Sequence, residues 1–227
     1  MHTPCSSAFG AQLARAADLP THLWLASKSP RRLALLRTLG IEPTVFLAQQ
    51  GEQAEALEEV QQHEAPVPYV QRVTRLKLDS AMRNLKQHTP ELVLAADTTV
   101  ALGNTILGKP ENAEQARAML HLLSGQTHQV HTAVAVGNLI SHAVACVVQT
   151  SEVEFATLPA TFIEAYIASG EPFDKAGGYG IQGVIAQYVR TLSGSHSGIM
   201  GLPLHETATL LKTLATPHPH DQRTNTG

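Results

Sequence analysis

Residues 22–40 read HLWLASKSPRRLALLRTLG, and this stretch predicts a strand that leads directly into a helix. The apolar run at 22–27 is rich in strand-forming residues, and the leucines that follow recur at helical spacing. Ser29 is predicted as the N-cap and Pro30 as the first helical residue, with Gly40 as the stop. A chain that begins its regular structure in this way favours an α/β fold.

Two arginines then occupy the first turn of the predicted helix. Arg31 and Arg32 lie at the positive end of the helix dipole, where acidic residues are normally favoured. Free helix N–H groups beside two guanidinium groups would bind an anion. The alternative is that both side chains extend into solvent at small cost. This stretch alone leaves both interpretations open, and it does not decide between a phosphate and a carboxylate ligand.

Composition limits the classes of function. The chain has 227 residues, of which 43% are hydrophobic and 15% charged, and its formal net charge is -3. This size supports a substantial core. Because no basic excess is present, we expect no sequence-specific nucleic-acid binding. The first residues lack the features of a signal peptide, no apolar run has membrane-spanning length, and the two cysteines form no disulfide framework, so we expect a cytoplasmic location without membrane contact.

The order of predicted elements indicates the domain organisation. We expect a flexible N-terminal extension at 1–21, a single α/β domain at 22–215 and a disordered tail at 216–227. Strands and helices alternate, with a long amphipathic helix at 67–85. A hairpin signal at 103–104 interrupts the alternation. The pattern therefore favours a mixed sheet flanked by helices over a purely parallel sheet.

Further charged residues lie beside the predicted strands. Asp97 closes the apolar run LVLAAD, and a carboxylate there is costly to bury unless it binds a metal, pairs with a cation or starts a turn. A turn-starting aspartate is the simpler alternative. Lys109, in GKP, follows a later strand, and Lys77 lies on the long predicted helix. Lysine and aspartate at neighbouring sheet ends suit phosphate and divalent-cation binding.

The segment 171–183, EPFDKAGGYGIQG, combines charged residues with four glycines. Glycines allow the backbone to approach a ligand closely, and loops of this kind often carry function. The alternative is a long turn stabilised by its own ion pairs. Three charged junctions of this type, each after a regular element, together favour a binding site for an anion.

Six segments resemble, in this order, the Maf family of nucleoside triphosphate pyrophosphatases: LASKSPRR, AADTTV, GKP, LSGQTHQVHTAVAV, EPFDKAGGYGIQG and GLPLHET. The resemblance runs from about Leu23 to about Leu214. It implies an elongated mixed sheet with flanking helices, in two lobes around a central cleft, and a homodimer. It also implies hydrolysis of a nucleoside triphosphate between its α and β phosphates, giving a monophosphate and pyrophosphate, with a divalent metal cation (Mg²⁺ or Mn²⁺).

The resemblance also implies roles for individual residues. Asp97 matches the catalytic acidic residue, and Glu52 and Asp97 match the metal-handling carboxylates. Gly51 stands where the family usually carries a further acidic residue. The positions implied to bind substrate or set specificity are Ser27, Ser29, Arg31, Arg32, Lys77, Thr98, Lys109, Asp174, Lys175 and Gln182.

Three of these positions resemble the branch of the family that cleaves dTTP and UTP, with modified pyrimidine nucleotides as further candidates. They are Arg31 after the Ser-Pro, Thr98 after the catalytic aspartate and Gln182 in IQG. One alternative is a pyrophosphatase for another nucleotide, such as 7-methyl-GTP. The other is an inhibitor of septum formation that acts by binding a partner.

Overall fold

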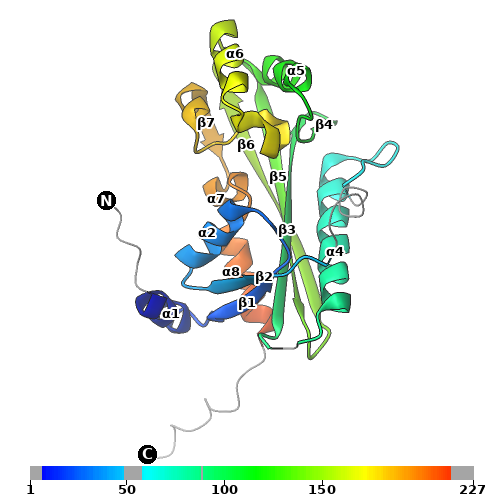
Figure 1. The fold of residues 1–227 in the computed structure, drawn as a ribbon, viewed down its shortest axis with the longest axis vertical. Helices are drawn as coiled ribbons and strands as arrows, with labels where there is room; N and C mark the ends of the chain where they lie inside the picture. Colours follow the sequence, from blue (N-terminus) through cyan, green and yellow to red (C-terminus); the bar gives the residue numbers. More distant parts are fainter. Residues whose placement is uncertain (1–6, 49–57, 88, 216–227) are drawn as a thin grey trace, which may run out of the picture.

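Seven strands form one mixed sheet in the computed structural model, which describes residues 7–48, 58–87 and 89–215 (Figure 1). The strands are β1 (His22–Leu25), β2 (Glu42–Val45), β3 (Leu92–Leu102), β4 (Thr105–Leu107), β5 (Thr127–Asn138), β6 (Val144–Phe155) and β7 (Val189–Ser193). Their order is β2-β1-β3-β5-β6-β7, and β4 pairs with β3. β1 runs parallel to β2 and β3, while the remaining pairs are antiparallel. The prediction of a mixed sheet with a hairpin at 103–104 is confirmed.

Helices cover both faces of the sheet near its N-terminal strands. They are α2 (Pro30–Thr38) and α8 (Leu204–Leu214) on one face and α4 (Pro66–Asn84) on the other. Because side chains alternate along a strand, β3 contributes residues to the hydrophobic core on each face of the sheet. Its Leu94 packs in the cluster that contains α2 and α8, whereas Val93 packs in the cluster that contains α4. Even-numbered residues of β3 therefore face α2, and odd-numbered residues face α4.

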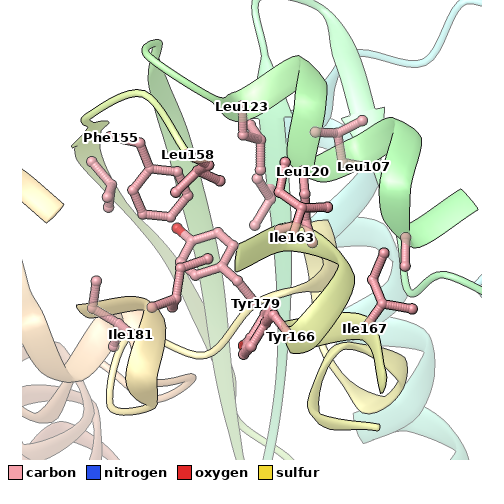
Figure 2. Close-up of a cluster of buried hydrophobic side chains, with 14 of the residues drawn as sticks. Leu107, Leu120, Leu123, Phe155, Leu158, Ile163, Tyr166, Ile167, Tyr179 and Ile181 are labelled. Atoms are coloured by element: carbon pink, nitrogen blue, oxygen red, sulfur yellow. The ribbon is translucent and has the colours of Figure 1, made fainter. Parts of the chain in front are cut away.

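The long strands β3, β5 and β6 extend to a second cluster of helices at the top of Figure 1. It comprises α5 (Ala113–Leu123), α6 (Ala160–Ala168) and the short 3₁₀ turns η1 (Glu171–Asp174), η2 (Ala176–Gly178) and η3 (Val184–Tyr188). Figure 2 shows Leu120, Phe155, Ile163 and Tyr179 packed together there. A short helix, α7 (His196–Ile199), connects β7 back to the lower part. The lower part, with α2, α4 and α8, and the upper part, with α5 and α6, form the two lobes that the family resemblance implies.

The strand predicted at 184–192 is only partly correct. Residues 184–188 form the 3₁₀ turn η3, and only residues 189–193 pair with β6. Ile185 is fully buried in the upper core, while Val184 is exposed. The turn η3 buries Ile185 without any sheet pairing. Packing of this side chain therefore outweighs the strand propensity of the segment.

The N-terminal segment differs from the flexible extension expected at 1–21. Residues Ser7–Ala16 form helix α1, and Ala14 is fully buried in the core shared with α2 and α8. Gly40 has a φ of +77°, and a Cβ there would lie 1.9 Å from the carbonyl oxygen of Gly10. The glycine that ends α2 thus also allows α1 to pack closely. The tail predicted to be disordered, 216–227, lies outside the described residues.

Gly40→Ala should destabilise the fold by about 2–4 kcal/mol, because it adds left-handed backbone strain to a clash with α1. Gly103→Ala is the matched control: its φ is also positive, at +57°, but a Cβ there meets nothing within 4 Å. The control should lose only about 1–2 kcal/mol. Urea unfolding of the two variants measures the difference, and equal losses would contradict the described packing of α1.

Candidate active site

The candidate site begins at an open edge of β3. On this edge β1 pairs with β3 as far as Leu94, and β4 joins it only from Val100. Between these points no described strand pairs with this edge, although β5 pairs along the other edge from Leu92 to Ala101. Asp97 lies in this interval. The prediction that Asp97 ends a strand is therefore wrong: β5 carries β3 past the carboxylate, which sits in mid-strand.

A cleft of about 510 Å³ opens at this edge. Eleven residues predicted for the site line it: Ser27, Ser29, Arg31, Arg32, Lys77, Asp97, Thr98, Lys109, Asp174, Lys175 and Gln182. Segments far apart in the sequence thus meet here, from the β1–α2 junction, α4, β3, the residues after β4 and the turns η1 and η2. Glu52, predicted as a metal ligand, lies outside the described residues.

Asp97 points to the α4 face of the sheet, where it contacts Lys77, which belongs to a charged cluster with Glu58 and Lys109. Its Oδ1 accepts a hydrogen bond from Lys77 Nζ at 3.1 Å. Lys77 Nζ also donates to Glu58 Oε1 at 2.6 Å, and Lys109 Nζ donates to Glu58 Oε2 at 3.2 Å. Glu58 therefore bridges both lysines. Sequence reasoning did not single it out, although it belongs to the acidic stretch 49–64 in which Glu52 was chosen.

The lysines set the ionisation of Glu58. Burial alone would raise the pKa of this carboxyl, but the Lys77 and Lys109 ammonium groups outweigh burial and hold its pKa below the ordinary value of 4.5. Glu58 is therefore ionised at neutral pH and compensates the charge of the two lysines.

Thr98 points to the opposite face, toward α2. Arg32 donates three hydrogen bonds there: from Nε to the Gly201 carbonyl at 2.8 Å, from one terminal nitrogen to Ser27 Oγ at 3.0 Å and from the other to Thr98 Oγ1 at 3.2 Å. Burial lowers the pKa of the Arg32 guanidinium. The cation is thus fixed in orientation, while two of its five N–H groups stay available for an anion. Ser29 is the N-cap of α2 as predicted, but its side chain makes no capping hydrogen bond.

Arg31 connects α2 to the glycine-rich segment. Its terminal nitrogen donates to Asp174 Oδ2 at 3.1 Å, and Lys175 Nζ donates to Asp174 Oδ1. Burial opposes ionisation of Asp174, but Lys175 and Arg31 hold its pKa below the ordinary value. Gly177 holds this segment in place, because its N–H donates to the Gly108 carbonyl at 2.9 Å and a Cβ would clash with Val100 at 2.9 Å.

The donor set can be tested against a divalent cation. Within the described residues, no group of three or more His, Cys, Asp or Glu side chains is arranged to hold a metal. Asp97 and Glu58, however, converge on one ammonium group, that of Lys77. Two carboxylates completed by substrate phosphates and water form a donor set that Mg²⁺ accepts. These residues therefore fit Mg²⁺ or Mn²⁺ bound together with a phosphate ligand.

Comparison with known proteins places this cleft in a family. A family model described as Maf-like protein matches residues 22–214, which include every residue of the cleft. The chain belongs to the Maf family. Helix α1 precedes the segment that the Maf model matches.

Curated bacterial relatives align with most of this chain and with most of their own length. A protein of Polaromonas sp. named dTTP/UTP pyrophosphatase is 52% identical over 192 residues, covering 84% of this Maf chain and 94% of the relative. Proteins of the same name in Cupriavidus metallidurans and Nitrosomonas europaea are 52% and 44% identical to this chain. Each alignment includes 84% of this chain, and the two include 95% and 93% of the respective relative.

In the described part of the chain, no helix is long and apolar enough to cross a membrane.

The bridge made by Glu58 should stabilise this Maf fold in a pH-dependent way. Folding lowers the pKa of Glu58, so the ionised carboxylate adds to the free energy of unfolding. This contribution is fully present above the ordinary pKa of the carboxyl and is lost as the pH falls through its pKa in the folded protein. Glu58→Gln should therefore cost about 0.5–1 kcal/mol near neutral pH and nothing in acid, where the wild-type carboxyl is also neutral. Urea unfolding of both proteins from about pH 7 to about pH 3 measures this.

Glu59→Gln is the control for this experiment, since Glu59 is an exposed neighbour outside the cleft lining. It removes one carboxylate without breaking the bridge between the two lysines. A stability gap between wild type and Glu58→Gln that persists unchanged into acid would contradict the role given to the bridge.

Proposed function

We propose that this protein hydrolyses dTTP and UTP to the corresponding monophosphate and pyrophosphate. The observation that carries the proposal is a buried carboxylate, Asp97, at an open strand edge between the lysines and arginines of one cleft. The relatives named dTTP/UTP pyrophosphatase, at 44–52% identity over 84% of this chain, supply the reaction and the substrates.

The charges of the cleft suit a triphosphate. Arg31, Lys77 and Lys109 are each paired with a carboxylate, either Asp174 or Glu58. A bound triphosphate would replace these carboxylates as the partner of the three cations, because it offers several strongly charged acceptor oxygens. The cations also stabilise the charge that develops on the departing pyrophosphate.

Asp97 has the role of general base in this proposal. It accepts a proton from the water that attacks the phosphate, and the phosphoanhydride bond between the α and β phosphates breaks as pyrophosphate leaves. Lys77, whose Nζ lies 3.1 Å from Asp97 Oδ1, holds the carboxylate in place. A divalent cation held by Asp97 and Glu58, with Glu52 as the further ligand predicted from the sequence, would neutralise phosphate charge and polarise the reacting phosphate.

Selection of the base falls to the other face of β3 and to the glycine-rich segment. Thr98 and Gln182 line the cleft and carry the donors and acceptors that a pyrimidine edge requires. Gln182 is exposed, so its amide is free to turn toward a ligand. The homodimer implied by the family resemblance and the cytoplasmic location expected from the composition belong to this proposal as well.

Asp97→Asn should lower kcat for dTTP and UTP by about 10³-fold, because the amide cannot accept the proton. Binding of a non-hydrolysable α,β-methylene analogue of UTP, measured by calorimetry, should stay within about threefold, since the cations are retained. Asp79→Asn is the matched control, as Asp79 lies on α4 two residues from Lys77 but is exposed and outside the cleft lining. Near-wild-type turnover in Asp97→Asn would remove Asp97 from the catalytic role.

Pyrophosphate release over a panel of triphosphates tests the proposed substrates. With Mg²⁺ or Mn²⁺ present, kcat/KM for dTTP and UTP should exceed that for CTP, GTP and 7-methyl-GTP by at least about tenfold. Chelation by EDTA should abolish release, since the phosphate charge is then not neutralised. Fastest turnover of 7-methyl-GTP, or no pyrophosphate from any substrate, would overturn the assignment.

A further inference from the structure

A chain of hydrogen bonds continues from Arg32 beyond the cleft. Arg32 donates to Thr98 Oγ1 at 3.2 Å, and Thr98 Oγ1 lies 3.0 Å from Thr132 Oγ1 on β5. Thr132 Oγ1 in turn lies 2.7 Å from the carbonyl oxygen of Gly198 in α7. Thr98 lines the cleft, whereas Thr132 is fully buried and does not.

The two ends of this chain fix the direction of every hydrogen bond in it. A carbonyl oxygen only accepts, so the single hydroxyl proton of Thr132 is committed to Gly198 at 2.7 Å. The hydrogen bond between the two threonines must then be donated by Thr98. At the other end, a guanidinium only donates, so Thr98 Oγ1 accepts from Arg32.

The surroundings hold this direction in place. Because Thr132 has no exposed surface, water cannot supply an alternative partner for its hydroxyl. The turn that accepts from Thr132 also accepts from Arg32, since the Gly201 carbonyl lies 2.8 Å from Arg32 Nε. The Gly201 N–H also donates to the Gly198 carbonyl at 2.9 Å, which fixes the position of that acceptor. The hydrogen bonds therefore form a closed ring through α7.

One property of Thr98 follows from this ring. Its only proton is used within the protein, so the hydroxyl offers a ligand in the cleft one acceptor lone pair and no donor. An acceptor of this kind attracts an N–H group of a base and repels a ring nitrogen with a lone pair. Uracil and thymine carry such an N–H at N3, whereas cytosine carries a lone pair at N3.

We propose that Thr132, although remote from the ligand, is a specificity-positioning residue: it fixes Thr98 as an acceptor and so favours uracil and thymine over cytosine. This inference rests on the proposed function, because it concerns the base of the same substrate. It assigns to Thr132 a discrimination between bases, apart from the hydrolysis assigned to Asp97 on the opposite face of β3.

Removal of the buried hydroxyl tests the proposal. In Thr132→Val the proton of Thr98 is freed, so Thr98 can donate to N3 of cytosine, and the ratio of kcat/KM for UTP to that for CTP should fall about tenfold. Thr132→Ala removes the hydroxyl without adding a methyl group and should lower the ratio equally, which guards against misfolding of the valine variant. Thr132→Ser restores the hydroxyl and should restore the ratio.

Thr99→Val is the matched control. Thr99 neighbours Thr98 on β3 and is 2% exposed, and its hydroxyl has no hydrogen-bond partner among the described residues. This variant should keep the wild-type ratio. Thermal unfolding of all variants shows which of them are folded.

The outcomes separate the two levels of the proposal. If wild type releases pyrophosphate from UTP but the folded valine and alanine variants keep its UTP to CTP ratio within about twofold, the role of Thr132 is overturned and the proposed function stands. A fall in kcat/KM that is equal for both nucleotides has the same meaning, because it indicates a structural role only. If wild type cleaves neither UTP nor dTTP, both the function and the inference fail.

Discussion

Strand β3 is paired with β5 from Leu92 to Ala101, but its other edge is shared by β1 and β4, which do not meet. This unequal pairing determines where the cleft lies. β1 stops because the chain turns into α2 at Ser29 and Pro30, and β4 begins only after the hairpin at 103–104. The interval exposes one edge of an otherwise buried strand, so polar side chains at Asp97 and Thr98 reach ligands without losing the support of β5.

Charge is balanced separately on the two faces of the sheet. On the α4 face, Lys77 and Lys109 share Glu58, and Lys77 also contacts Asp97. On the α2 face, the partly buried charge of Arg32 is held by neutral acceptors, namely a carbonyl and two hydroxyls. In the proposed function, the first arrangement would exchange a carboxylate for a phosphate, whereas the second, whose hydrogen bonds are fixed, would select the base by hydrogen-bond geometry. Chemistry that needs mobile charge and recognition that needs fixed dipoles are thus kept apart.

The sequence allowed prediction of the mixed sheet and the main helices because these depend on local periodicity. It allowed prediction of a set of cleft residues because short motifs that resemble those of the Maf family carry them. Three features could not be read in this way. Asp97 was placed at a strand end because its run of apolar residues stops there, while pairing with β5 continues the strand. Helix α1 is as amphipathic as α4 and α8, but its attachment to the domain depends on the close approach of Gly10 to Gly40, which the sequence pattern does not show. Thr132 lies 34 residues from Thr98, and only strand register joins them.

Asp97 and Thr98 are consecutive, and they face opposite sides of the sheet. The side-chain period of a strand is two, so a slip of one residue between β3 and β5 would turn both side chains to the opposite faces of the sheet. A slip in one direction would place the Asp97 carboxylate opposite Thr132, and a slip in the other direction would place the Thr98 hydroxyl at the position that faces Lys77. Ten consecutive residue pairs hold that register. The alignment of two strands therefore determines which side chain reaches each face of the sheet. An insertion or deletion within β3 would turn the residues that follow it to the wrong face rather than only displace them along the strand.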